Sequence, residues 1–155
     1  MAFNLMYEHQ FEIQTGTDET TEEAIFSPLA AGISSAEPAN NEELAQDRYL
    51  DGAGFGETDV IGAQLVVSFS GHRLYGDEAQ DYIFERLLLL GENRRTAFKW
   101  TEPNGDMFEG NCTIANIEGP GGDAGAKGEI SFEIHFNGEI TYTPAGSDNG
   151  GGGEG

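Results

Sequence analysis

The sequence has few basic residues. Its 155 residues include 7 Lys and Arg against 28 Asp and Glu, which gives a formal net charge of −21. Because a protein that grips nucleic acid by its phosphates needs a basic face, this composition excludes that class of binding. The chain also has ten Phe, five Tyr and one Trp, which disordered acidic chains lack. We therefore expect a folded, strongly acidic protein.

Cysteine and long apolar runs are also scarce. Cys112 is the single cysteine, which excludes an internal disulfide framework and favours synthesis in a reducing cytosol. No apolar run approaches the roughly 20 residues that span a membrane. The first residues, MAFNLMYEHQFEI, carry acids where a signal peptide has a basic region. We expect no membrane association.

Motifs for catalysis, cofactors and metals are missing as well. Gly119, Gly121 and Ala124 match the G-x-G-x-x-A spacing of a dinucleotide-binding turn, but a strand pattern follows them where a helix would be needed. The three histidines fall in separate predicted strands, too few and too dispersed for a zinc site. No nucleophile elbow and no D-x-D-x-D-G calcium loop occurs. We predict no enzymatic activity, no cofactor and no metal site.

The apolar pattern predicts a mainly β fold with one helix. The helix is expected over 77–90, with Asp77 as its cap and Gly91 as its stop. The pair Asn137-Gly138 predicts a type I′ hairpin between the last two strands. Such a set favours an antiparallel β-sandwich or open barrel flanked by one α-helix. The strands are expected at about 5–13, 24–26, 60–74, 94–102, 107–117, 128–136 and 139–143.

The segment 31–59 differs from the rest in composition. It is rich in Ala, Gly, Asn, Glu and Pro, which predicts a long loop that reaches out to something. Residues 145–155 are typical of a flexible, glycine-rich tail. We expect one domain over 1–144.

The charge is unevenly distributed. Residues 1–60 hold 13 acids and one base, residues 61–105 hold six acids and five bases, and residues 106–155 hold nine acids and one base. One interpretation is an ordinary solvated acidic surface. The other interpretation is that the nearly neutral segment 61–105 makes contacts, while the segments before and after it present a negative surface.

Residues 77–143 carry a resemblance to a known family. The order is a helix that ends in a leucine run and Gly91, then Arg94-Arg95, "FKWTEPNGD" and "EGNCTIANIEGPGGDAGAKGEISFEIHFNGEI". This succession resembles the major tail protein, or tail tube protein, of long-tailed bacteriophages with non-contractile tails. The acidic first half agrees in layout only, and we expect no separate immunoglobulin-like domain of the sort that some family members carry.

The resemblance implies a structural protein of the virion tail, made in the cytoplasm of the bacterial host. Its β-sandwich would assemble as hexameric rings stacked into a tube whose lumen DNA crosses without specific binding. Partners would be other copies of the chain and the tail terminator, tape measure and distal tail proteins. The long loop over 31–59 would bridge subunits.

We combine the resemblance with the charge pattern to predict the wall of the lumen. Strand 128–136 alternates, so Ile130, Phe132, Ile134 and Phe136 form one row and the polar residues form the other. Carboxylates in such a wall would repel passing DNA near the wall, within a Debye length of ~10 Å at 0.1 M salt. The predicted lumen-facing residues are Glu8, Gln10, Glu12, Glu129, Ser131 and Glu133.

The basic residues are predicted to contact acids of neighbouring subunits and so to offset their repulsion. Ordinary pairing within the chain is the alternative. The predicted contacts between subunits are Arg48, Arg86, Arg94, Arg95 and Lys99.

Two other functions remain open. One is a monomeric β-sandwich that binds carbohydrate or a surface, although the only tryptophan, Trp100, lies beside Lys99 in a strand that alternates as if half-buried. The other is the related tube of a contractile injection device.

Overall fold

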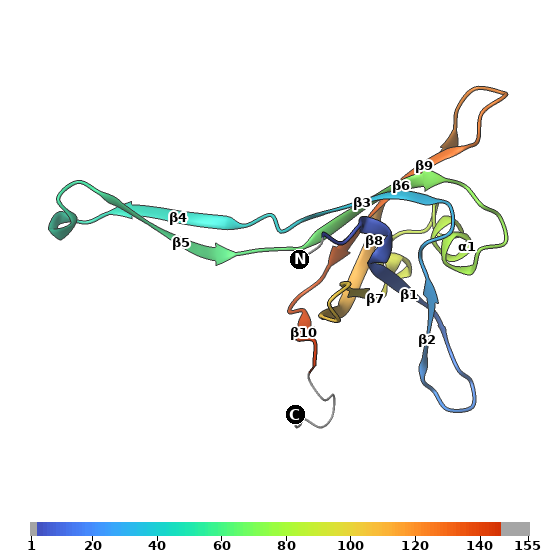
Figure 1. The fold of residues 1–155 in the computed structure, drawn as a ribbon, viewed down its shortest axis with the longest axis horizontal. Helices are drawn as coiled ribbons and strands as arrows, with labels where there is room; N and C mark the ends of the chain where they lie inside the picture. The colour runs from blue at the N-terminus through green and yellow to red at the C-terminus, as the bar shows by residue number, and fades with distance from the viewer. Residues whose placement is uncertain (1–2, 147–155) are drawn as a thin grey trace.

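A computed structural model of the chain describes residues 3–146, and the predicted tail over 145–155 lies almost wholly outside them. The chain is mainly β (Figure 1). Its strands are β1 (Gln10–Thr17), β2 (Ala24–Pro28), β3 (Ile33–Ala39), β4 (Glu43–Arg48), β5 (Gly56–Gly62), β6 (Val66–His72), β7 (Arg95–Thr101), β8 (Met107–Gly121), β9 (Glu129–Phe136) and β10 (Thr141–Thr143). Its helices are α1 (Glu78–Phe84) and the short 3-10 turns η1 (Met6–Glu8), η2 (Leu50–Gly52) and η3 (Gly91–Arg94).

Most strands form one antiparallel sheet in the order β2-β1-β7-β8-β9-β6-β3, with β10 added to β8. Phe11 in β1 and Phe69 in β6 are separated by three strands in this order, yet their ring centroids lie 5.1 Å apart. The sheet must therefore curve until its two halves face each other. This arrangement agrees with the predicted open barrel.

The core lies between the two halves of the curved sheet. In β9 the predicted inward row, Ile130, Phe132, Ile134 and Phe136, is at most 3% exposed. The ring of Phe69 stacks on that of Phe132 at 5.3 Å and meets that of Phe98 at 5.9 Å. Aromatic pairs at these separations add to the free energy gained by burial. This confirms the alternation predicted for β9.

The helix begins as predicted and ends early. The Asp77 carboxylate accepts a hydrogen bond from the Gln80 amide at 3.1 Å, which caps α1. Beyond Phe84 the amides of Arg86, Leu87 and Leu89 bond three residues back, as in turns. The prediction of a helix to residue 90 was wrong: α1 ends at Phe84, and the turns that follow it are held by hydrogen bonds from Arg94, as described below.

The long loop predicted over 31–59 is instead largely β structure. β3 pairs with β6 at one edge of the sheet, and β4 pairs with β5 in a separate two-stranded sheet. Figure 1 shows β4 and β5 projecting far from the body. We call residues 43–62 the arm. The segment therefore does reach outward, but as a hairpin with its own ladder.

Three further boundaries differ from the predictions. The first strand starts at Gln10, because residues 6–8 form η1. The strand predicted over 60–74 is split between the end of β5 and β6. β10 pairs with β8 instead of forming a hairpin with β9, because β9 is already flanked on both sides by β8 and β6.

Candidate assembly surfaces

The outer side of β3, β6, β8 and β9 is a polar face. Strand pairing aligns its side chains in rows across the sheet: Ser68 lies opposite Glu37 and Glu133, and Ser70 lies opposite Ser35 and Ser131. The face is hollowed, with a volume of about 400 Å³. Its polar lining consists of Ser35, Glu37, Ser68, Ser70, Asn116, Glu118, Ser131 and Glu133.

The polar face contains acids but no Lys or Arg. No Lys or Arg occurs in β3, β6, β8 or β9. The Glu133 carboxylate accepts a hydrogen bond from Asn116 at 2.8 Å and lies 2.8 Å from the His135 ring. The His135 contact and then the Asn116 bond lower the pKa of Glu133 below its ordinary value. Glu133 therefore carries its charge at neutral pH.

Of the predicted lumen residues, the structure brings together only those of β9. Glu129, Ser131 and Glu133 share the polar face with β6. Gln10 and Glu12 flank Phe11, whose ring faces that of Phe69 across the core, so their side chains point away from the polar face. Glu8 lies in η1 and outside the strand in which it was predicted.

Two of the predicted inter-subunit cations have contacts within the chain. The Arg94 guanidinium donates to the carbonyls of Leu87 (2.9 Å), Leu89 (2.9 Å) and Ile114 (3.0 Å), and so fixes the segment after α1. Arg86 donates to the Tyr82 carbonyl at 2.9 Å, and its guanidinium lies 3.5 Å from the centroid of the Tyr82 ring.

The other three cations have fewer contacts. Lys99 lies opposite both Glu12 and Glu109 in the sheet, and its Nζ is 4.2 Å from the centroid of the Phe26 ring. Arg48 and Arg95 are exposed, and neither forms an ion pair within residues 3–146. These two side chains are free to meet another chain.

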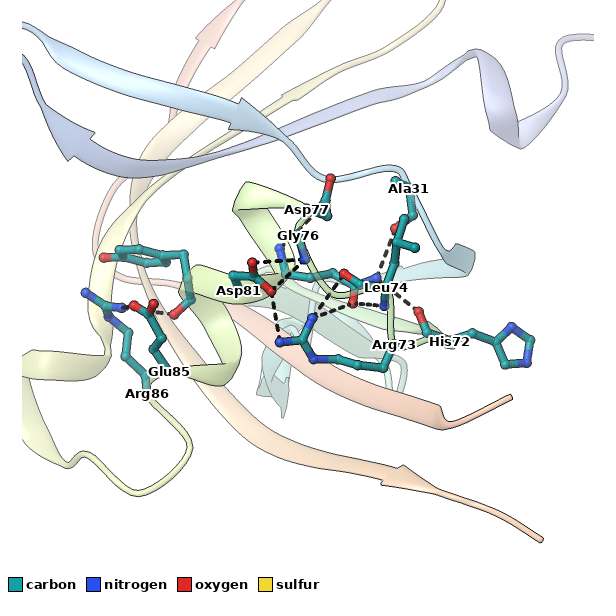
Figure 2. Close-up of polar contacts among 11 residues, drawn as sticks. Ala31, His72, Arg73, Leu74, Gly76, Asp77, Asp81, Glu85 and Arg86 are labelled. Atoms are coloured by element: carbon teal, nitrogen blue, oxygen red, sulfur yellow. Dashed lines mark hydrogen bonds and ion pairs between the residues drawn. The ribbon is translucent and has the colours of Figure 1, made fainter. Parts of the chain in front are cut away.

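A buried polar cluster, missed in the sequence, attaches α1 to the sheet (Figure 2). Gln80 is fully buried; its amide nitrogen donates to the carbonyls of Ala31 and His72, and its oxygen accepts from the Leu74 amide at 2.8 Å. Arg73 pairs with Asp81 at 3.0 Å. The sequence signal that could have indicated this cluster is a glutamine among the apolar residues of the helix.

Within the described residues there is no group of three or more His, Cys, Asp or Glu that could hold a metal ion. No helix in this part of the chain is long and apolar enough to cross a membrane.

The structure defines a class of fold: a curved, mainly antiparallel sheet with one packed helix. No protein-family model matches the sequence, and no curated protein matches it. Solved structures do match. A chain from the tail of an empty gene transfer agent particle, refined with C6 symmetry, has a TM-score of 0.69 at 16% identity and covers 92% of this chain and 100% of that one.

Two further structures extend the comparison. The SPP1 tail tube has a TM-score of 0.59 at 18% identity and covers 89% of this chain and 77% of that one. A chain of the sheath–tube complex of PVC, an extracellular contractile injection system, has a TM-score of 0.55 at 10% identity and covers 92% of each chain. The protein therefore has the fold found in these tails and tubes.

Proposed function

We propose that this chain is the repeating structural subunit of a phage-type tail tube, assembled as stacked hexameric rings. The observation that carries the proposal is the polar face: four neighbouring strands with no Lys or Arg, on a fold shared with tail and tube proteins. In this arrangement the polar face lines the lumen, and β9 contributes Glu129, Ser131 and Glu133 to it.

The charge of the polar face suits the passage of DNA. Duplex DNA carries one negative charge per ~1.7 Å of axis, so a basic wall would adsorb it. A wall with Glu37, Glu118 and Glu133 and without Lys or Arg repels it instead. The role of the chain is then structural, and its partners are other copies and the proteins that start and end the tail.

Bare sheet edges support the assembly. β2 and β3 are the two edges of the curved sheet, and unpaired edges invite pairing with another chain. In a ring, β3 of one subunit and an edge of the next would continue the sheet around the lumen. We assign the inter-subunit role of residues 31–59 to this edge and to the arm.

The assembly is tested by electron microscopy of the purified chain at high concentration. We expect hollow tubes or rings with six-fold symmetry. A chain that stays monomeric at every concentration would overturn the proposal and favour a monomeric surface-binding module. The likeness to the PVC complex makes a contractile device the second candidate; a sheath that copurifies with native tubes would favour it.

The lumen is tested by two matched double variants. Glu129→Lys with Glu133→Lys changes the β9 row, and Glu8→Lys with Glu12→Lys changes the same number of charges outside that row. We expect both to form tubes and only the first to slow DNA ejection, measured by release of a DNA-binding dye. Slowing by the second variant alone would place the lumen against the other half of the curved sheet.

A further inference from the structure

A run of exposed leucines follows α1. Leu88 is 87% exposed and Leu90 79% exposed, while Leu87 and Leu89 are about 40% exposed. We call residues 87–90 together with Arg95 the leucine patch. Exposed apolar groups gathered in one place mark interaction sites more often than isolated ones do.

The leucine patch is held in a fixed shape. Arg94 donates to the carbonyls of Leu87 and Leu89 within the patch and to Ile114 in β8, each at 2.9 to 3.0 Å. The segment is thus tied to the sheet by one guanidinium, and its side chains face outward. A surface ordered before binding loses less conformational entropy on contact.

The leucine patch lies in a locally basic segment of a very acidic chain. Residues 86–95 contain three arginines against Glu92, a net charge of +2 in a chain of −21. Arg95 is exposed and has no ion pair within residues 3–146. An approaching surface that is apolar and acidic would match both features.

The tip of the arm has these properties. Leu50 is fully exposed, Phe55 is 77% exposed and Tyr49 54% exposed. The arm carries five acids against one base, Arg48. β4 and β5 pair only with each other, and Figure 1 shows the arm and α1 on opposite sides of the body. The tip therefore cannot reach the leucine patch of its own chain.

We propose that the arm tip of one copy docks on the leucine patch of another copy, with Leu50 and Phe55 against the leucines and the acids of the arm near Arg95. A contact between opposite ends of a molecule repeats from copy to copy, so it builds closed rings or open helical assemblies. The inference rests on the proposed tube, for which it names one of the contacts between subunits.

Disulfide trapping tests the contact in assembled protein. The variant Leu50→Cys with Leu88→Cys should give a ladder of cross-linked oligomers after oxidation, because each copy carries both ends. Leu50→Cys with Tyr142→Cys, which places the second thiol on exposed β10, should give none. Cys112 is fully buried and does not compete.

Charge reversal gives an independent measurement. Arg95→Glu should raise the concentration needed for tube formation at least tenfold, whereas Lys127→Glu, the same charge change in the β8–β9 loop, should alter it less than twofold. This inference alone would be overturned if the wild-type chain forms tubes but the variant Leu50→Cys with Leu88→Cys gives no cross-linked ladder. Equal effects of the two charge reversals would also overturn it. A wild-type chain that never assembles would overturn the proposed function and this inference with it.

Discussion

The curved sheet and the arm are both built from antiparallel strands, but only the sheet buries its apolar side chains. In β9 the inward row is at most 3% exposed. In the arm Leu44 and Val60 lie opposite each other in the ladder and are still 49% and 59% exposed. Two strands alone cannot cover an apolar face. The sheet thus covers its apolar side chains within the chain, whereas the arm leaves its own exposed.

Truncation of a core ring should separate the two regions most strongly. Phe132 is 1% exposed and stacks on Phe69, so Phe132→Ala should lower the free energy of unfolding by about 3–5 kcal/mol. Phe55→Ala on the arm should change it by less than about 0.5 kcal/mol. Urea denaturation of the unassembled chain measures both. Similar losses at the two positions would show that the arm packs on the body in solution.

The reactivity of a thiol should also differ strongly between the core of the sheet and the arm. Burial raises the pKa of Cys112 to about 12, against an ordinary value of about 8.5. At pH 8 we expect Cys112 to react with a disulfide reagent roughly a thousandfold more slowly than an ordinary thiol, because the thiolate is the reactive form. Leu50→Cys in a Cys112→Ser background is the comparison. Equal rates would mean that the core opens readily.

Loss of the buried amide should have a smaller effect. Gln80→Ala leaves the Ala31 and His72 carbonyls and the Leu74 amide without their partner, so we expect a loss of about 1–3 kcal/mol. Gln46→Ala in the arm removes only an exposed bond of 3.4 Å to Thr58. Its loss should stay below about 0.5 kcal/mol. A stable Gln80→Ala protein would show that α1 is held by its apolar face alone.

The smallest effect concerns the attachment of β10. The Asp106 carboxylate accepts from the Ala145 amide at 2.7 Å and from the Tyr142 hydroxyl at 3.1 Å, and the Ala145 bond is the main cause of its lowered pKa. The contribution of ionised Asp106 to the stability of this attachment is therefore complete above the ordinary aspartate pKa of about 3.9. It is lost as the pH falls through the lower pKa that Asp106 has in the folded chain.

Amide hydrogen exchange at Ala145 measures this attachment. In the wild-type chain we expect the Ala145 amide to be protected at pH 6, relative to its intrinsic exchange rate, and to lose this protection in strong acid. In Asp106→Asn the protection of Ala145 should already be lower at pH 6. Asp59→Asn on the arm is the control and should leave Ala145 unchanged. Protection that is the same in all three proteins would mean that the β8–β10 ladder suffices.

Local patterns predicted the parts of the fold that depend on near neighbours. The alternation over 128–136 predicted β9 and its buried row, and Asp77 predicted the start of α1. β3, with the sequence ISSAEPA, was missed because its side chains have low strand propensity. It is a strand because β6 offers it an edge.

The candidate surfaces depended more on distant contacts. Glu129, Ser131 and Glu133 were predicted on one face from their spacing, but nothing local showed that Glu37 and Ser68 join them. Arg94 was predicted to contact another subunit, whereas the structure gives its guanidinium three carbonyls of its own chain.

The sequence by itself determined the charge balance, the absence of Lys and Arg from the segments that become β3, β6, β8 and β9, and the two-residue period of the strands. These properties follow from the order of residues alone. The tertiary structure decided which strands share a face, which edges stay bare and where the arm points. Those outcomes depend on pairing between segments far apart in the chain, where burial of the common core selects one register among many that the local patterns allow.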